Sequence, residues 1–360
     1  MTFSTYGGPE VLQESELPTP ELRPDEVLVA VRLAAVNPYD LKLRSGAMQE
    51  NVHPRFPVTP GSELAGVVVA VGPQRAEGAV APGATSAGGD RAGAGAAAGA
   101  SPADSEAGAS PANSGAGAAP ASSGSGASPA KPPVVWPALA VGDEVFGWGR
   151  SGSYAEFAAA RAVIRKPAGL HWETAASIVV AGATAIRVLR ELHLERGETL
   201  LVHGGAGGVG SAAIQLAVRA GATVIATCSE RDAEAVRELG AHPVRYGEGV
   251  FERVRELAPD GVDAVFDTAG AGVLPGSVEL AGGPERVITI ADQAAFGLGV
   301  TFSSGGAGEQ TPDVLQTIAD LVLSGDLIVA PARHFALRDA PAAQAALAAG
   351  GFRGKTLLDV

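Results

Sequence analysis

The sequence predicts an α/β protein that combines a small β domain with a doubly wound parallel sheet. Val-rich segments with strand alternation fill much of residues 26–161 outside one compositionally biased segment. From about residue 171 the pattern changes, and short apolar segments alternate with helical ones. That alternation implies right-handed crossovers between parallel strands, so we expect helices to cover the sheet.

The chain is acidic and contains a single cysteine. Its 360 residues include 26 Lys and Arg against 39 Asp and Glu, which gives a formal net charge of -13. This balance argues against nucleic-acid binding and against docking on an anionic membrane, because both depend on clustered basic residues. With Cys228 alone, neither an intramolecular disulfide nor a metal site with two thiolates from one chain can form.

No targeting or membrane segment is visible in the sequence. No apolar run approaches the roughly 20 residues of a membrane span. Residues 1–10 lack the basic and apolar regions that make up a secretory signal. We therefore expect a cytoplasmic protein that binds neither nucleic acid nor membrane.

One long segment cannot form a packed core. Ala, Gly, Ser and Pro account for 50 of the 61 residues from 73 to 133, which contain one Val and no Leu, Ile or Phe. Such a composition buries too little apolar surface to offset the entropy lost on ordering. We expect a disordered surface loop, because loop-closure cost grows only slowly with length. A linker or docking tail is the alternative.

The expected elements follow from alternation and from turn residues. In the β region we expect short strands and turns at residues 26–36, 64–72, 141–149 and 153–161. In the second region the expected strands are residues 199–203, 223–227, 243–246, 263–268, 286–290 and 300–304. The expected helices are residues 209–220, 231–240, 251–257 and 311–325.

A glycine-rich loop carries the chemistry of the second region. Residues 203–211 read HGGAGGVGS and contain the pattern GxGxxG between an expected strand and an expected helix. Glycines let the backbone approach a pyrophosphate, and the helix start offers free N–H groups and a positive dipole end. A Gly-rich turn without a ligand is the alternative. We expect a dinucleotide to bind here, on Gly205, Gly207, Gly208, Val209 and Gly210.

The end of the next expected strand indicates which dinucleotide binds. NAD-dependent enzymes usually place an Asp or Glu about 20 residues after the glycine loop, on the ribose 2′-hydroxyl. Here Ser229 and Arg231 suit a 2′-phosphate, because a guanidinium binds phosphate through several donors. Glu230 is the contrary residue, since it could bind a 2′-hydroxyl or begin the next helix. We favour NADPH.

Beyond this motif, nine segments spread in order over the chain carry a resemblance. They are YGGPEVLQ (6–13), AAVNPYDLKLRSG (34–46), PGSELAGVVVAVG (60–72), VGDEVFG (141–147), GSYAEF (152–157), VAGATA (180–185), LLVHGGAGGVGSAAIQLA (200–217), DAVFDTAG (263–270) and RGKTLLDV (353–360). With them the chain resembles the zinc-independent medium-chain dehydrogenase/reductases, in particular the NADPH:quinone oxidoreductase (zeta-crystallin-like) group. The biased segment falls outside the resemblance.

The resemblance implies a domain organisation. Residues 1–170 would form a GroES-like catalytic domain, interrupted by the insertion 73–133. Residues 171–297 would form a Rossmann domain that binds NADP, and residues 298–360 would return to the catalytic domain. The cofactor would lie in the cleft between the two domains, and by resemblance we expect a homodimer.

The resemblance also argues against a zinc site. Zinc-dependent relatives place a Cys and a His-Glu pair at the catalytic metal, where this chain has Asn37 and Ser62-Glu63. The six histidines show no close ligand spacing: His53, His171, His193, His203, His242 and His334. We expect no bound metal. Hydride transfer should then favour an acceptor that is already electron-poor, such as a quinone or an activated alkene.

Candidate catalytic residues come from the same resemblance. The Asn-Pro segment would lie near the nicotinamide, so Asn37 and Lys42 are the polar groups that could assist protonation of the acceptor. Asn37 could equally form an Asx-type turn before Pro38, and Lys42 could be an ordinary surface charge. Glu63 could be a structural acceptor in the β domain.

The remaining cofactor contacts are expected by analogy alone. Thr184 would meet the nicotinamide ribose or amide, and Tyr246 would flank the 2′-phosphate unless it is a core residue at a strand end. Ile290 and Ala291 would line the nicotinamide face. Lys355, with Arg353, could approach the cofactor from the tail, and both could instead be surface cations.

Three functions stay open at this point. The first is an NADPH-dependent quinone reductase. The second is a reductase of the same fold that acts on enones, 2-alkenals or an enoyl thioester. The third is a protein that binds NADP(H) without significant turnover, such as a redox sensor, because fold alone does not decide function.

Overall fold

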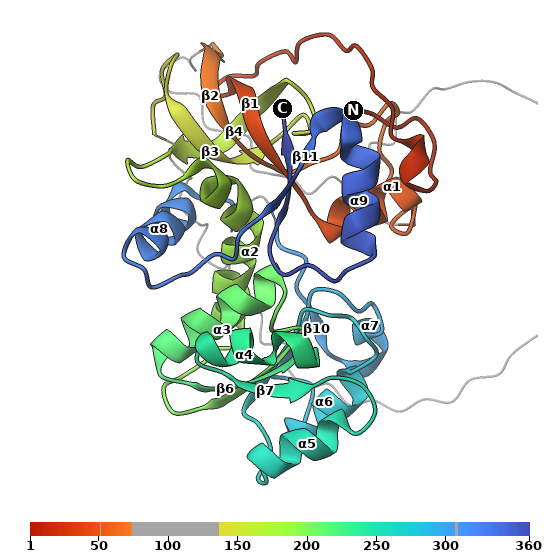
Figure 1. The fold of residues 1–360 in the computed structure, drawn as a ribbon, viewed down its shortest axis with the longest axis vertical. Helices are drawn as coiled ribbons and strands as arrows, with labels where there is room; N and C mark the ends of the chain where they lie inside the picture. Colours follow the sequence, from red (N-terminus) through yellow and green to blue (C-terminus); the bar gives the residue numbers. More distant parts are fainter. Residues whose placement is uncertain (51, 74–136, 307–308) are drawn as a thin grey trace, which may run out of the picture. The chain divides into compact units, whose positions relative to one another are not determined.

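The structure, a computed structural model, describes residues 1–50, 52–73, 137–306 and 309–360, which form two six-stranded sheets (Figure 1). Apart from Pro73, the segment 73–133 that we expect to be a disordered loop lies outside the described residues. The α/β fold class predicted from the sequence is confirmed.

The first sheet is built around one long central strand. Its order is β11 (Arg333–Ala336), β12 (Thr356–Asp359), β1 (Val27–Val36), β2 (Glu63–Val71), β3 (Glu144–Gly149) and β4 (Phe157–Arg165). Strands β1 to β4 are antiparallel, and β4 returns to pair with the first half of β1, so these four strands close on themselves. The last strand, β12, pairs with the second half of β1 and brings the C-terminus into this sheet.

Alternation along the strands explains the core of this sheet. Val27, Val29 and Val31 are buried in one apolar cluster, whereas Leu33 and Ala35 turn to a second cluster after a register shift in β1. Two helices accompany the sheet, α1 (Pro38–Ser45) and α9 (Ala340–Ala348), and both begin with proline in the first turn, where its missing N–H costs nothing.

Every strand pair in the second sheet is parallel. Its order is β10 (Thr301–Phe302), β9 (Val287–Thr289), β8 (Ala264–Asp267), β5 (Thr199–His203), β6 (Thr223–Cys228) and β7 (His242–Arg245). Counted from β5, this is the order 3-2-1-4-5-6 read from the β7 edge, the doubly wound arrangement of dinucleotide-binding sheets. The sheet continues to Phe302, past residue 297, where the sequence placed the domain end.

Helices cover both faces of the parallel sheet. Leu200 and Val202 pack with α3 (Gly208–Ala220) and α4 (Ala233–Glu238), whereas Leu201 between them points to the opposite face. That second face is covered by α5 (Val250–Leu257), α6 (Leu274–Leu280) and α7 (Ala295–Leu298), so the strands are buried on both sides (Figure 1).

A long helix, α2 (Trp172–Glu191), contributes to the cores of both sheets. Ile178, Ala185 and Val188 pack with the parallel sheet, and Ala175 and Val179 pack with the other sheet and with α8 (Pro312–Leu323). Among the described residues it is the one helix long and apolar enough to cross a membrane by length and composition. The sequence predicted no such segment, and the packing of Ile178, Val179 and Val188 in the two cores identifies α2 as a core helix.

Candidate cofactor and active site

The loop between β5 and α3 is fixed by hydrogen bonds to Thr227 and within the loop itself. Gly204 has a φ of 80° and donates its N–H to Thr227 Oγ1 at 3.1 Å, and Gly205 N donates to Thr227 O at 2.9 Å. Gly207 N then donates to Gly204 O at 3.0 Å and begins α3 as its N-cap. The first amides of α3 have no partner within the helix and point out of its start.

Four glycines of the loop have different surroundings. A Cβ on Gly205 would lie 2.7 Å from Ala226 Cβ, and one on Gly210 would lie 2.2 Å from Gly204 O, so both are fixed by packing within the protein. A Cβ on Gly207 would meet only Gly204 O, at 3.3 Å, and one on Gly208 only Ala181 Cβ, at 3.8 Å. At Gly208, and with slight crowding by Gly204 O at Gly207, the protein therefore leaves space at the helix start that a phosphate group can use.

This loop lies at the point where the strand order reverses. Strand β5 is flanked by β6 on one side and by β8 on the other, and ligands of doubly wound sheets bind outside the carboxyl ends of strands at such a point. Hydrogen bonds to Asp267 fix the carboxyl end of β8. Asp267 Oδ1 accepts from the N–H groups of Ala269 and Gly270, and Asp267 Oδ2 accepts from Thr289 Oγ1. Asp267 thus caps the turn that follows β8.

A cavity of about 190 Å³ adjoins the glycine loop. Its lining comes from α2, the loop and the start of α3, α4, and two segments near the C-terminus, and includes Ser177, Ala181, Gly208, Ser211, Leu239, Ile328, Arg353 and Lys355. The Ser177 hydroxyl is buried in this lining and has no hydrogen-bond partner among the described residues. A buried hydroxyl without a partner is unfavourable, so this one fits a polar ligand in the cavity.

The carboxyl end of β6 brings three predicted residues close together. Ser229 Oγ donates to Asp232 Oδ2 at 2.6 Å, and Arg231 Nε lies 3.5 Å from the same oxygen. Tyr246 N donates to Cys228 O at 3.2 Å, and its side chain is 60% exposed. The Arg231 side chain is 59% exposed, so both side chains are free to contact a ligand at this strand end. Tyr246 is not a core residue.

Asn37 and Lys355 meet in a buried polar cluster with Glu63. Lys355 Nζ donates to Asn37 Oδ1 and to Glu63 Oε2, both at 2.7 Å, and Asn37 Nδ2 donates to Glu63 Oε2 at 2.6 Å. The other carboxylate oxygen, Glu63 Oε1, accepts from Val180 N of α2 at 2.6 Å. Glu63 is fully buried, Asn37 is 6% exposed, and the Lys355 side chain is 12% exposed.

Asn37 also begins α1, which connects it to a second buried carboxylate. Asn37 N donates to Asp40 Oδ2 at 2.8 Å, and Gly61 N donates to Asp40 Oδ1 at 3.2 Å. Burial raises the pKa of Asp40 from 3.8 to about 6, against the lowering effect of these two N–H groups and of Lys355. The turn at Asn37 is made by its backbone, whose C=O accepts from Asp40 N at 3.0 Å, whereas its side-chain amide contacts Glu63 and Lys355 in place of the expected Asx-type turn. Its role toward the acceptor stays a prediction.

Lys42 lies elsewhere, beside the end of β9. Its Nζ donates to Ala291 O at 3.4 Å, in an exposed hydrogen bond. Ala291 and Ile290 follow β9 directly and are half-buried, as is Thr184 in the middle of α2. The structure therefore pairs Lys42 with Ala291, and pairs Asn37 with Lys355.

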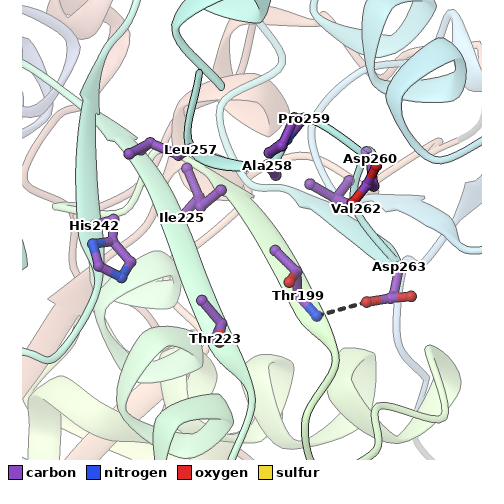
Figure 2. A pocket seen from close by; sticks show the side chains of 11 residues that line it. Thr199, Thr223, Ile225, His242, Leu257, Ala258, Pro259, Asp260, Val262 and Asp263 are labelled. Atoms are coloured by element: carbon purple, nitrogen blue, oxygen red, sulfur yellow. Dashed lines mark hydrogen bonds between the residues drawn. The ribbon is translucent and has the colours of Figure 1, made fainter. Parts of the chain in front are cut away.

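A second hollow lies at the opposite edge of the parallel sheet. It has a volume of about 420 Å³ and lies at the amino ends of β5, β6 and β7, among Thr199, Thr223, His242 and the loop 257–263 (Figure 2). Asp263 Oδ2 there accepts from Thr199 N at 2.7 Å. Because parallel sheets bind ligands at their carboxyl ends, we assign the coenzyme to the glycine loop.

Among the residues that the structure describes, no group of three or more His, Cys, Asp or Glu side chains could hold a metal ion. His203 has a local partner instead: its Nε2 pairs with Ser277 Oγ at 3.0 Å, and burial lowers its pKa. Sequence reasoning did not assign Glu63 or Ser177 to the site. The segment 60–72 contained Glu63, but nothing in the sequence showed that it would meet a residue close to the C-terminus.

Two protein families match the chain. The alcohol dehydrogenase GroES-like domain matches residues 23–168, and the zinc-binding dehydrogenase family matches residues 208–317. The first match includes Asn37 and Glu63, and the second begins at Gly208 in the glycine loop. The first match covers β1 to β4 of one sheet, and the second covers β6 to β10 of the other.

Curated relatives carry related names. A 2-methylene-furan-3-one reductase of Solanum lycopersicum is 30% identical over 80% of this chain, and an NADPH-dependent alkenal/one oxidoreductase of Arabidopsis thaliana is 31% identical over 74%. The chain spans 61% and 56% of the lengths of these two proteins. A quinone oxidoreductase of Pseudomonas aeruginosa is 29% identical, over 99% of this chain and 98% of that protein.

Solved structures share the whole fold. The quinone oxidoreductase of Pseudomonas syringae pv. Tomato is 27% identical, with a TM-score of 0.73 over 100% of this chain and 98% of that one. A mycobacterial protein, Rv1454c, solved in complex with NADPH, is 25% identical, with a TM-score of 0.74 over 100% and 99%. With both of its domains matched, this chain belongs to the medium-chain dehydrogenase/reductase superfamily, within its quinone oxidoreductase group.

Proposed function

We propose that this protein is an NADPH-dependent, zinc-independent oxidoreductase that transfers hydride to a quinone or a similar electron-poor acceptor. The observation that carries the proposal is the glycine loop at the reversal of strand order, where an added Cβ would be in ordinary contact at Gly208 and only slightly crowded at Gly207. The relative from Pseudomonas aeruginosa is named a quinone oxidoreductase, and the mycobacterial neighbour was solved with NADPH.

The residues present fit a nicotinamide dinucleotide phosphate. The amides of Gly208, Val209 and Gly210 at the start of α3 would hold the diphosphate, with Gly205 and Gly207 shaping the turn. Arg231 would bind the 2′-phosphate beside Tyr246, and Ser229 would join it by turning its hydroxyl from Asp232 to the phosphate. The unsatisfied Ser177 hydroxyl and Lys355 supply further polar contacts in the adjoining cavity.

The coenzyme, when bound, supplies a hydride, and the chain orients the acceptor and stabilises the charge that develops on it. Thr184, Ile290 and Ala291 would line the nicotinamide site, and the Lys42 ammonium, held on Ala291 O, would sit at its rim. Asn37 would present its side-chain amide to the acceptor, and solvent would provide the proton. Because Asn37 and Ser62 stand where zinc-dependent relatives carry Cys and His, the acceptor must already be electron-poor.

A second candidate function is the reduction of enones or 2-alkenals. It is favoured by the two plant relatives, which are named for a furanone and for alkenals and alkenones. The same site would serve, because both reactions deliver hydride to an electron-poor carbon or oxygen conjugated with a carbonyl.

The protein would act in the cytoplasm, as a homodimer.

Turnover assays separate these functions. Metal-free protein is mixed with NADPH or NADH and with panels of quinones and enones, and loss of reduced coenzyme is followed by absorbance. Oxidation of NADPH by quinones supports the proposal, and oxidation by enones alone supports the second function. Coenzyme binding without turnover on either panel would indicate a non-enzymatic NADP(H)-binding sensor. Loss of activity in the presence of chelators would contradict a zinc-independent reaction.

A further inference from the structure

The side-chain amide of Asn37 is held between an anion and a cation. Its Nδ2 donates to Glu63 Oε2 at 2.6 Å, and its Oδ1 accepts from Lys355 Nζ at 2.7 Å. The three groups come from distant parts of the chain: the start of α1, the start of β2, and the residue before β12. They form a closed triangle, since Lys355 also donates to Glu63 at 2.7 Å.

This arrangement fixes which way the amide points. If the amide turned over, Asn37 Oδ1 would face the Glu63 carboxylate, and Nδ2 would face the Lys355 ammonium. Both contacts would then be repulsive, because a carboxylate only accepts hydrogen bonds and an ammonium only donates them. Asn37 and Glu63 are buried, so little water is present to satisfy the turned amide.

Glu63 is itself held in place. Its second oxygen accepts from Val180 N in α2 at 2.6 Å, so the carboxylate cannot rotate without losing a buried hydrogen bond. The whole triangle is thus anchored to the core helix that also lines the cavity beside the glycine loop. Lys355 lines the same cavity, which places the cluster directly beside the candidate coenzyme site.

We propose that Glu63 and Lys355 are positioning residues, and that they hold Asn37 so that its second Nδ2 hydrogen donates to the acceptor oxygen. This inference rests on the proposed function. The acceptor gains two electrons and one hydrogen as a hydride from NADPH, which is left as NADP⁺. The acceptor oxygen carries the resulting negative charge until a solvent proton neutralises it. A donor already oriented toward that oxygen stabilises the transition state without reorganisation.

The Glu63→Gln variant tests the orientation. The introduced side-chain amide can still accept from Val180 N through its oxygen, but its N–H donors then face Asn37, whose Nδ2 no longer has an acceptor. At saturating NADPH, kcat should fall roughly 10- to 100-fold. Removing an oxyanion donor outright lowers kcat by about 10²–10³-fold, and misorienting one should cost less. KM for the acceptor should change much less than kcat. Glu144→Gln is the matched control, since Glu144 pairs with Lys166 in the same sheet.

The double variant Glu63→Gln/Lys355→Met separates positioning from stability. It removes both charges of a buried ion pair, a replacement that often leaves stability unchanged or improved. A purely structural pair would therefore recover both melting temperature and kcat in the double variant, with kcat measured at NADPH concentrations that saturate each variant, so that a lost contact between Lys355 and the coenzyme changes only KM for NADPH. We expect the melting temperature to recover and kcat to stay low, because Asn37 Oδ1 is then free to accept from the amide introduced at position 63. The double variant also keeps the test valid if Glu63→Gln alone does not fold.

A graded series of acceptors supplies the last readout. If Asn37 donates to developing negative charge, the loss of kcat in the variants should grow as the quinone becomes a weaker oxidant. An equal loss on every quinone, or a kcat within about 2-fold of wild type in both folded variants, would overturn the positioning role. Wild-type protein that turns over neither quinones nor enones would instead refute the proposed function, and the inference with it.

Discussion

The glycine loop gives a prediction in which stability and coenzyme binding separate. Replacement of Gly207 by alanine should leave the fold intact and weaken NADPH binding, whereas replacement of Gly210 should damage the fold itself. The contrast follows from what each added methyl group would meet. At Gly210 the methyl carbon would lie 2.2 Å from Gly204 O and 2.9 Å from Gly205 Cα, and both are backbone atoms that cannot move aside alone.

The magnitudes follow from these distances. Forcing an extra methyl into packed surroundings costs typically about 1–3 kcal/mol, so Gly210→Ala should lower the melting temperature by several degrees. At Gly207 the backbone is extended, with φ −75° and ψ 168°, and the nearest atom is Gly204 O at 3.3 Å. That slight crowding is offset by the roughly 0.4–1 kcal/mol that alanine gains by restricting the unfolded chain.

The assay is a pair of measurements on each variant: thermal unfolding without coenzyme, and calorimetric titration with NADPH. Gly207→Ala should melt within about 2 °C of wild type. It should bind NADPH at least about 10-fold more weakly, because the added methyl group keeps the diphosphate from the backbone, and a tenfold loss corresponds to only about 1.4 kcal/mol of binding free energy. Wild-type affinity in a folded Gly207→Ala protein would refute the assignment of the diphosphate to this loop.

Three further predictions address other parts of the site. Arg231→Ala should weaken NADPH binding about 10-fold and leave NADH binding unchanged, and equal effects on both in titrations would exclude a 2′-phosphate contact. Ser177→Ala should keep or raise the melting temperature while weakening NADPH binding, because its buried hydroxyl has no protein partner among the described residues. The raised pKa of Asp40 should make wild type lose about 2 kcal/mol of unfolding free energy as the pH rises from about 4 to 7, and the Asp40→Asn variant should not show this loss. Denaturant unfolding at the two pH values checks this, and an equal change in both proteins would contradict it.

The local sequence pattern was sufficient to predict those helices and strands that their own residues determine. The strand β5 was predicted at residues 199–203 and is found at Thr199–His203, and α3 begins one residue before its predicted start. Apolar strands buried on both faces and a glycine loop between strand and helix are local signals. The parallel order around β5 then follows from the handedness of the crossovers.

Elements with weak local signals were missed. The helix α2 was not predicted, because its Val, Ile, Thr and Gly residues have modest helix propensity and packing between two cores stabilises it instead. Residues 153–161 were expected to contain a strand, which the structure places at Phe157–Arg165. There the chain is drawn into the sheet by its pairing with β1 and β3, and the β1 partners lie far away in sequence.

The site shows the same division. The glycine loop and the polar residues after β6 could be read from short motifs, because their partners are near in sequence. The meeting of Asn37 and Glu63 with Lys355 could not, since it joins residues about 300 positions apart through the pairing of β12 with β1. The role of Glu63 therefore emerges only from the three-dimensional arrangement.

The coenzyme itself offers the most direct examination of the whole account. Isothermal titration of metal-free, folded protein with NADPH should show saturable uptake of one molecule per chain, and the bound coenzyme should then lose its near-ultraviolet absorbance when a quinone is added. Absence of any heat of binding for NADPH and NADH, with the protein folded by circular dichroism, would contradict the assignment of this loop to a nicotinamide coenzyme.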